Sequence, residues 1–540
     1  MVARIPLIVN SSAEQIQELP SGDSISIPGD LDVTGSLTGN ALHGVKLTAD
    51  GTIAANAAVV LTSAGKVKAI SSVEESVDGA SSTWFASNGS SQAVYALHDG
   101  AWFGSQNAAI IAWKIKSSTS SLDQRLQIQA GTLSGTSVSW GTQLNVDEQT
   151  GNIAVASNGN DKAILMYDLG SATRIRTFTV SGTTITLGNL VTVRSDSDEG
   201  SLCYLGEDGG SEYFVVAYRQ TTGSNNESYI KIIKHDGHNN TTLSSTQYKV
   251  DGATTNTHST THLIPISHNK FIVQVGQLNG NTTMHICTRN GTTTKIGQAY
   301  TSAELGTAAD TVYLHQYHNN GSAYDPINKK YIIWHNAGNE QEGSVRVYNI
   351  DGTSFNFQFE SDFVDAGVDH THYMGYPTVE VTDKGQIVVT FGASSNHYSK
   401  RVVGDYNDER DGITWGAVTT WSSEDTDSVQ QIKADDGKII NVYAGHSGSA
   451  GYTVSGKSLV FQTATTTLTA DNFLGFSAAG YSDGNTASIS VLGSKTTQSS
   501  LTIGKEYYVQ DNGTIGIGKS SFGVIAGKAL SATSLLITPV

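Results

Sequence analysis

Short apolar runs separated by polar turns recur through the middle of the chain. One unit has strand-like runs that start at Phe271, Thr282 and Thr293, with a tight turn at Asn290-Gly291. Comparable apolar runs start near Val94, Ile153, Phe214, Phe271, Tyr331, Ile387 and Ile439, at spacings of 52 to 61 residues. Runs of this length bounded by turn residues are typical of β-strands. The pattern therefore predicts seven copies of one β-strand unit.

A second pattern gives the same count. Each apolar run is followed by a glycine preceded by Ser, Asp or Asn: Gly135, Gly182, Gly237, Gly291, Gly352, Gly412 and Gly456. A tight hairpin turn with positive φ at both central residues selects these residue types. We therefore expect a hairpin turn in each of the seven units.

A repeated unit of about four strands and roughly 40–50 residues is the signature of a propeller blade. The units here are slightly longer, and we assign the excess to loops. Radial repetition covers the apolar face of each sheet and leaves only short edges exposed. The predicted fold is all-β, with a seven-bladed β-propeller over residues 80–466. An array of two-sheet sandwiches is the competing interpretation, but no linker separates the units.

Both ends of the chain depart from the repeat. Residues 1–45 are predicted to form an N-terminal region for attachment or oligomerisation, residues 46–79 a small β module with a linker, and residues 467–540 a C-terminal β module. In the first region a short helical turn is expected after Ser12. Apolar residues at alternate positions then predict a half-buried strand: Ile25, Ile27, Leu31, Val33 and Leu37. Such a strand would form an oligomeric stem or dock on its own propeller.

Composition narrows the class of protein. The 540 residues include 57 glycines but only 7 prolines, and the formal net charge is −17. Phosphate contacts need a basic surface, so nucleic acid and anionic membrane surfaces are disfavoured as partners. The start of the chain lacks the apolar core of a signal peptide, and no run approaches a membrane span. The two cysteines, Cys203 and Cys287, are expected in the core without a disulfide.

The two ends carry a resemblance to a known family. The opening residues Ala3–Asn10 and Ser12–Gly22 resemble the start of virion appendage proteins from marine phages, especially cyanophages. The stretches Leu468–Gly475, Gly504–Gly513 and Ala526–Thr533 are similar to their terminal module. Ser134–Gly141 and Ser181–Gly188 resemble the propeller-type repeat of the family. The resemblance implies a tail fibre or similar appendage, often trimeric, with one end on the virion and the other facing the host.

Histidines form three pairs, each a short distance before an apolar run. The pairs are His258 with His262, His315 with His318, and His370 with His372. We expect them near the inner strands of their units, close to the propeller axis. Imidazoles that converge there could bind a transition metal. The alternative is that they are polar loop residues bonded to neighbours or water, and we predict no cofactor.

Aromatic residues at the ends of units are candidates for receptor binding: Trp84, Trp102, Trp334, Tyr398, Tyr406 and Trp421. A flat ring can stack on a sugar, and neighbouring Asn and Asp side chains can fix its orientation. The alternative is that the rings fill gaps between blades, which is the more common environment of tryptophan.

The acidic stretch Asp405–Gly412 offers oxygen ligands for Ca²⁺, but it lacks the spacing of an EF-hand loop. Its continuation Asp411–Trp415 loosely resembles the structural hairpin of sialidase-like propellers. No nucleophile elbow, zinc motif or phosphate loop is present. A glycosidase would need two paired carboxylates, and no pair stands out. We therefore predict no catalytic residues.

The sequence as a whole favours a non-enzymatic virion protein that contributes to recognition of the host surface. It is expected to bind other tail proteins through its N-terminal region, to form a homotrimer, and to contact a host glycan or protein. It would be made in the host cytoplasm and localise to the virion, with no membrane insertion. The alternatives are a polysaccharide-degrading tailspike and a connector that binds only virion proteins.

Overall fold

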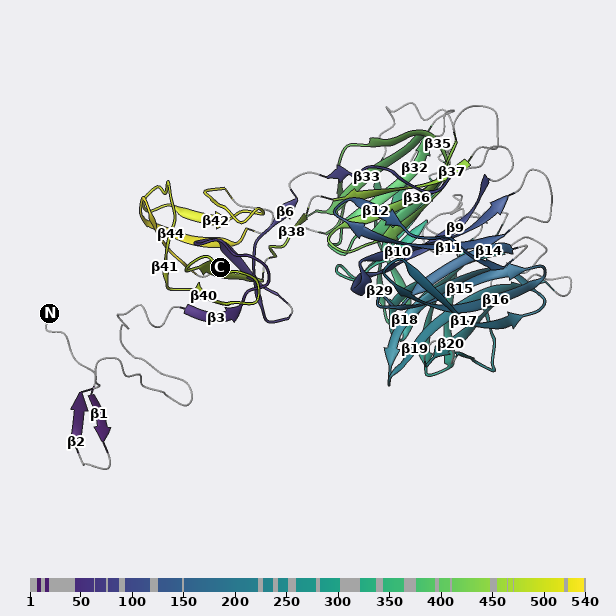
Figure 1. Cartoon of the computed structure of the whole chain (residues 1–540), viewed down its shortest axis with the longest axis horizontal. Coiled ribbons are helices and arrows are strands. Elements are labelled where there is room, and N and C mark those ends of the chain that lie inside the picture. Colours follow the sequence, from purple (N-terminus) through teal and green to yellow (C-terminus); the bar gives the residue numbers. More distant parts are fainter. Residues whose placement is uncertain are drawn as a thin grey trace. The chain divides into compact units, whose positions relative to one another are not determined.

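The computed structural model describes most of the chain (Figure 1). The described residues are 7–10, 15–18, 44–62, 64–73, 76–86, 93–116, 125–147, 150–221, 227–236, 241–250, 259–277, 282–301, 321–336, 343–363, 375–393, 398–407, 410–446, 454–463, 465–469, 471–518 and 523–538. The chain divides into two compact units. Unit 1 contains residues 1–72 and 466–540, and unit 2 contains residues 73–465. Unit 2 carries the repeated sheets.

Unit 2 is a β-propeller built from antiparallel sheets. The innermost strands are β9 (Ala93–Phe103), β14 (Thr150–Ser157), β18 (Ser197–Asp208), β23 (Ser259–Ser267), β27 (Ser322–Asp325), β31 (Gly375–Val381) and β35 (Thr419–Lys433). The second strands are β10 (Ala108–Lys116), β15 (Lys162–Leu169), β19 (Ser211–Gln220), β24 (Lys270–Gln277), β28 (Lys330–Asn336), β32 (Ile387–Ala393) and β36 (Lys438–His446). Each of these second strands pairs with the innermost strand before it and with a third strand after it.

The third strands are β11 (Leu126–Ser134), β16 (Ala172–Ser181), β20 (Glu227–His235), β25 (Thr282–Asn290), β29 (Gly343–Asp351), β33 (Tyr398–Tyr406) and β37 (Val454–Gln462). The outer strands are β12 (Ser137–Trp140), β13 (Leu144–Asp147), β17 (Thr184–Arg194), β21 (Thr241–Leu243), β22 (Tyr248–Val250), β26 (Thr293–Thr301), β30 (Ser354–Asp362) and β34 (Ile413–Trp415). Strands β31–β37 share one nine-stranded sheet with β7 (Val77–Asp78) and β8 (Ser82–Phe85). Because this sheet spans the last two predicted units, the count of seven blades stays a prediction.

The hydrophobic cores lie between neighbouring sheets. Strand β19 is buried along almost its whole length, from Ser211 to Arg219, because sheets cover both of its faces. One cluster joins the sheet of β9–β11 to that of β14–β16, and others continue the series from sheet to sheet. A further cluster packs Trp113 of β10 against Ile440 of β36 and so joins the first sheet to the last. The ring of sheets is therefore closed.

Closure of the ring uses a segment from the N-terminal side of the propeller. The last strand, β37, pairs antiparallel with β8, with Ser458 opposite Ser82. It also pairs with β7, with Phe461 opposite Asp78. The sequence alone did not settle which end of the chain supplies the closing strand, and these pairings answer that question.

The predicted repeat register needs a correction. The apolar runs near Val94 and Ile153 belong to innermost strands, whereas Phe214 and the four later starting points belong to second strands. The two strand types are both apolar because both pack between sheets, so hydrophobicity alone did not separate them. The first two starting points therefore mark a different strand from the other five.

The hairpin turns also differ in detail from the prediction. Four hairpins close over a two-residue loop that starts with glycine, and the φ values of Gly135, Gly182, Gly291 and Gly352 lie between 57° and 59°. The threonine that follows each of them does not have positive φ, so the pattern is that of a type II′ turn, with glycine first. Gly456 lies within β37 and is not a turn residue, while Gly237 lies outside the described residues.

Unit 1 joins segments that the sequence analysis assigned to separate modules. One five-stranded sheet has the order β3 (Gly44–Thr48), β40 (Thr486–Ser490), β39 (Phe473–Ser477), β4 (Ala58–Leu61) and β5 (Val67–Ala69). A second contains β41 (Lys495–Thr497), β45 (Ser534–Leu536), β44 (Ile525–Ser531), β42 (Glu506–Val509) and β43 (Ile515–Gly516). The small N-terminal module and the C-terminal module thus fold as one body, because the short strands of each bury their apolar faces against the other.

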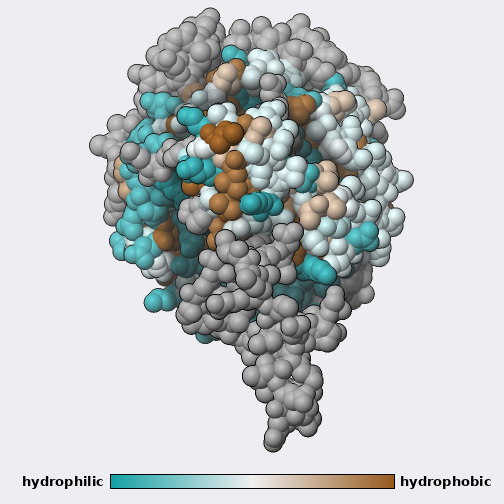
Figure 2. Space-filling model, turned by 90° about the vertical axis from the view of Figure 1, so that its left-hand side faces the viewer, coloured by the Kyte–Doolittle hydropathy of each residue, from teal (hydrophilic) through white to brown (hydrophobic). Residues whose placement is uncertain are grey.

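Apolar side chains also lie at the surface (Figure 2). In unit 1 the exposed ones include Val45, Leu61, Leu492, Ile503, Ile517 and Leu530. Before this body, β1 (Leu7–Asn10) and β2 (Gln15–Glu18) form an antiparallel hairpin. The prediction of a helical turn after Ser12 is therefore wrong for residues 15–18, which form β2. The strand predicted over residues 25–37 lies outside the described residues. None of the described helices is long and apolar enough to span a membrane.

Candidate functional site

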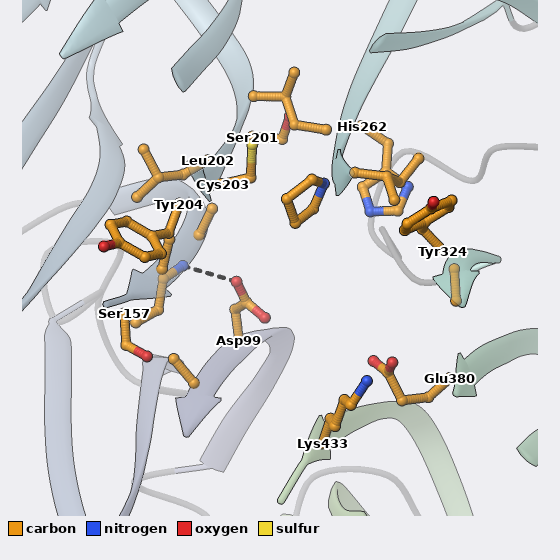
Figure 3. Close-up of a pocket in the computed structure, with 18 of the residues that line it drawn as sticks. Asp99, Ser157, Ser201, Leu202, Cys203, Tyr204, His262, Tyr324, Glu380 and Lys433 are labelled. Carbon is orange, nitrogen blue, oxygen red and sulfur yellow. Dashed lines mark hydrogen bonds between the residues drawn. The ribbon is translucent and has the colours of Figure 1, made fainter. Parts of the chain in front are cut away.

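The innermost strands of the propeller surround a cavity of about 540 Å³. Residues from β9, β14, β18, β23, β27, β31 and β35 all line it, which places it on the axis of the ring (Figure 3). We call it the axial cavity. Its volume lies within the range of small-ligand sites, roughly 300–1,000 Å³. It is the candidate site because it brings together polar side chains that are far apart in the sequence.

The lining of the axial cavity differs from one side to the other. Strands β14 and β18 contribute mainly apolar residues, such as Val155, Leu202 and Leu205, whose side chains also belong to the cores between the sheets. Strands β9, β35 and β31 contribute the charged side chains Asp99, Lys433 and Glu380. A ligand that fills the cavity would therefore meet an apolar wall and a charged wall.

Asp99 is held by backbone groups. Its Oδ2 accepts a hydrogen bond of 2.7 Å from the Val155 N–H, drawn as a dashed line in Figure 3. Burial raises the pKa of Asp99 to about 7, and the backbone N–H groups of Val155 and Gly100 oppose this only in part. No cationic side chain in the described ranges forms an ion pair with Asp99. The carboxyl group is therefore poised to change its charge near neutral pH.

Glu380 and Lys433 point toward one another across the cavity wall in Figure 3. Burial raises the pKa of Glu380, while the positive charge of Lys433 and the Val381 N–H act in the opposite direction. The Val381 N–H donates a hydrogen bond of 3.0 Å to the Glu380 Oε1. Lys433 is thus the counter-charge to Glu380, whereas Asp99 has no counter-charge among the residues that the structure describes.

Two buried polar atoms of the lining have no hydrogen-bond partner among the described residues. They are the Oγ of Ser201, whose residue is 2% exposed, and the Oε1 of Gln431, whose residue is 5% exposed. The amide of Gln431 is oriented by its Nε2, which donates to the Asn441 Oδ1 at 3.4 Å. A buried acceptor or hydroxyl group without a partner is costly, so both atoms are suited to bind a ligand group.

His262 lines the axial cavity, as expected for a residue on an innermost strand. Its Nδ1 lies 3.1 Å from the Gln274 Oε1 and 3.4 Å from the Ser322 Oγ. Burial lowers the pKa of His262 to about 4, so the ring is neutral at physiological pH. The other candidate metal ligands, His258, His315, His318, His370 and His372, lie outside the described residues. Within the described ranges no cluster of three or more potential ligands could hold a metal ion.

Most of the aromatic candidates for receptor binding are packing residues. Trp84, Trp334 and Trp421 are 2%, 5% and 8% exposed. The Trp84 ring meets Trp113 edge-on at 4.8 Å, and the Trp421 ring meets Tyr443 edge-on at 5.1 Å. Rings buried in this way have no free face for a sugar, so these three assignments are corrected to packing between sheets.

The remaining aromatic candidates have different surroundings. Tyr406 is partly buried against the core between β28 and β32, and its ring packs edge-on against Phe359. Trp102 is partly buried and lines the axial cavity. The side chain of Tyr398 lies outside what the structure describes. Of the six candidates, Trp102 is therefore the one that the structure brings to the site.

The described residues of the acidic stretch that was considered for Ca²⁺ lie at the end of β33 and just before β34. The Nδ2 of Asn407 donates to the Asp411 Oδ1 at 2.7 Å, and the Asp411 and Gly412 N–H groups donate to the Asn407 Oδ1. These bonds organise a structural hairpin, as the loose resemblance of Asp411–Trp415 implied. The cysteines, as expected, are free and buried.

Sequence reasoning did not identify Asp99, Glu380, Lys433, Ser201 or Gln431. Each lies on an innermost strand, where a polar residue among apolar ones fits ordinary strand alternation. The available signal was a charged residue in the first strand of a repeat, which would point to the axis. That signal required knowledge of which strand is innermost, and five of the seven starting points mark second strands instead.

The titration of Asp99 gives a testable pH dependence. We expect the free energy of unfolding to fall as the pH rises from about 4 to about 7, because over this range Asp99 keeps its proton in the folded state whereas the unfolded chain has lost it. The slope is at most about 1.4 kcal/mol per pH unit for each such proton. Asp168 and Glu199 also have pKa values raised to about 7 by burial, so they add to the slope.

Urea unfolding at several pH values would measure this slope in the wild type and in Asp99→Asn. The variant should lose the part of the slope that belongs to Asp99 and keep the rest. Asp351→Asn, at an exposed position at the end of β29, serves as the control for removal of one acid. If the free energy of unfolding had the same pH dependence in the wild type and in Asp99→Asn, the raised pKa of Asp99 would be contradicted.

Comparisons with known proteins were made for the whole chain. Neither a family model nor a curated protein matches it. Solved structures similar to it include a fucose-specific lectin from Aleuria aurantia, with 12% identity and a TM-score of 0.38 over 62% of this chain and 97% of that chain. The WD40 domain of SCAP from fission yeast has 9% identity and a TM-score of 0.38 over 77% and 98%.

A prolyl endopeptidase structure is also similar, with 10% identity and a TM-score of 0.35 over 66% of this chain and 46% of that chain. At these TM-scores the likenesses carry no argument about this chain. Its class follows from its own topology: it contains a β-propeller with a polar cavity on the axis.

Proposed function

We propose that this chain is a non-enzymatic recognition protein of a phage virion appendage, and that its propeller binds host-surface carbohydrate in the axial cavity. The observation that supports this most is the composition of the cavity. An apolar wall from β14 and β18 faces a wall that carries Asp99, Glu380 and Lys433. A sugar ring has the matching properties, with apolar C–H faces and a rim of hydroxyl groups.

The size and the hydrogen-bonding groups of the cavity agree with such a ligand. A volume of about 540 Å³ accommodates one or two sugar rings. The partly buried Trp102 offers aromatic surface at the lining, and Ser201 and Gln431 offer buried groups for sugar hydroxyls. The cavity therefore supplies both contacts that bind a sugar, namely aromatic surface and oriented polar atoms.

The assignment to a virion appendage is supported by the resemblance at the two ends of the chain. The residues that carry it near the C-terminus include Leu468–Gly475 and Gly504–Gly513, which belong to the folded body of unit 1. On this proposal, residues 1–45 attach the protein to other tail proteins and hold a homotrimer, and the protein is located in the virion. The propeller is then the part that is presented to the host.

Binding of the purified chain to an array of bacterial surface carbohydrates tests the proposal. We expect binding to a defined set of glycans, and at least a tenfold loss of affinity in the double variant Asp99→Asn/Glu380→Gln, since each charged hydrogen bond contributes about 1.5–3 kcal/mol. Both substitutions preserve side-chain shape. Asp351→Asn, at an exposed position, is the matched control and should bind like the wild type.

The alternatives give different results. Release of reducing sugar from a bound polysaccharide would overturn the non-enzymatic assignment in favour of a tailspike enzyme. Binding to purified tail proteins without any binding to carbohydrate would favour the connector. Equal glycan binding by the double variant and the wild type, with both fully folded by thermal unfolding, would place the ligand outside the axial cavity.

A further inference from the structure

We infer that the ligand of the axial cavity carries a positively charged amine, as an amino sugar does. This inference rests on the proposed function, because it concerns the ligand of the same site. The geometry that carries it is the placement of two acids and one base on three innermost strands, Asp99 on β9, Glu380 on β31 and Lys433 on β35.

The charges in the cavity do not balance. The titratable groups that line it are Asp99, Cys203, Tyr204, His262, Tyr324, Glu380 and Lys433. Burial raises the pKa values of Cys203 and Tyr324, and it raises that of Tyr204 to about 12. It lowers the pKa of His262 to about 4. These four groups are therefore neutral near pH 7. The groups of the described lining that remain are two acids and one base, and the pKa of about 7 leaves Asp99 partly protonated while no opposite charge lies beside it.

Lys433 already has a partner in this set. It points toward Glu380 in Figure 3, and its charge opposes the effect of burial on the pKa of Glu380. Among the described residues, the hydrogen-bond partners of Asp99 are the backbone N–H groups of Val155 and Gly100. A buried carboxylate is stabilised most by an opposite charge, so a cationic group on the ligand would supply the counter-charge for Asp99.

A hydrogen-bond acceptor without a partner in the described lining supports the same inference. The Gln431 Oε1 is an acceptor in a 5% exposed residue, and it has no donor among the described residues. It belongs to β35, the same strand as Lys433, and β35 packs beside β9 in the ring. An ammonium group has three donors and no acceptor. Asp99 and the Gln431 Oε1, on these two neighbouring strands, are the acceptors that we assign to this group.

The apolar wall explains why a bare ammonium ion is an incomplete fit. The residues that β14 and β18 contribute to the lining, Val155, Leu202 and Leu205 among them, carry no charge. A ligand that has an amine on one side and a C–H face on the other satisfies both walls. Amino sugars have this arrangement. Neutral sugars lack the charged amine, and N-acetylated sugars have a neutral amide in its place.

Isothermal titration calorimetry at about pH 7 with glucosamine, N-acetylglucosamine and glucose tests the inference. We expect glucosamine to bind at least about tenfold more tightly than the other two, because a charge-assisted hydrogen bond contributes about 1.5–3 kcal/mol. Asp99→Asn should remove this preference, so that glucosamine binds no more tightly than glucose. Asp351→Asn should retain the preference.

The other outcomes separate this inference from the proposed function. Equal binding of the three sugars, or a preference that survives in Asp99→Asn, would overturn the amine while the cavity remained a carbohydrate site. Tight binding of a neutral glycan that depends on Glu380 would also overturn the amine and leave the cavity as a carbohydrate site. If none of the three sugars binds and no carbohydrate on the array binds, both proposals are overturned.

Discussion

Replacement of Trp84 by alanine is expected to lower the free energy of unfolding of the propeller by about 3–5 kcal/mol, the usual loss when a large buried aromatic side chain is removed. Trp84 belongs to β8, the strand that closes the ring against β37. Its Nε1 donates a hydrogen bond of 2.8 Å to the Lys457 carbonyl, and its ring packs against Trp113. A Cβ at Gly456 would lie 2.4 Å from the Trp84 ring, so the two strands are fitted to each other.

Denaturant unfolding of Trp84→Ala would measure this loss. Phe357→Ala on β30 is a suitable control, because Phe357 is 50% exposed and its removal should change stability by less than about 1 kcal/mol. Glycan binding by the folded fraction of Trp84→Ala should match that of the wild type. A variant of unchanged stability that loses glycan binding would show that Trp84 stacks on a sugar and would contradict the packing assignment.

Replacement of Asp78 by alanine is expected to destabilise the same closure by about 2–3 kcal/mol. Arg401 donates from Nη1 and Nη2 to the two carboxylate oxygens of Asp78, at 2.8 and 3.0 Å. The Arg401 side chain is only 4% exposed and lies over the Phe461 ring, so its charge would be left buried without a partner. Loss of one partner of a buried pair costs about 3–5 kcal/mol, and the 36% exposure of the Asp78 side chain reduces the expected value.

A double-mutant cycle with Asp78→Ala and Arg401→Met would isolate the coupling of the pair. We expect Arg401→Met alone to cost less than Asp78→Ala alone, because methionine leaves no buried charge and still packs against Phe461. Asp351→Ala is the control for removal of an exposed acid. Additive effects in the cycle would show that the ion pair does not contribute to closure.

Much of the fold could be predicted from the sequence, because period and turn chemistry are local signals. The apolar run at Phe271 and the turn at Gly291 each indicated strands, and repetition of the two indicated a propeller. The pairing of β37 with β8 and of β3 with β40 was not predictable, since each joins residues hundreds of positions apart. Such pairings depend on how sheets pack, and no short stretch of sequence records them.

The candidate site was harder to predict than the fold. Of the residues selected from the sequence, His262 and Trp102 line the axial cavity, whereas Trp84 proved to be a packing residue. Aromatic rings were selected for their chemistry, and burial decides whether that chemistry is available. Asp99 and Glu380 were missed because only the convergence of the innermost strands makes isolated acids into a cluster.

A crystal structure of the protein with glucosamine tests the central claim most directly. The account predicts one sugar in the axial cavity, with its amine hydrogen-bonded to Asp99 and its ring against the wall formed by β14 and β18. A crystal saturated with the sugar that holds it only outside the cavity would contradict the account.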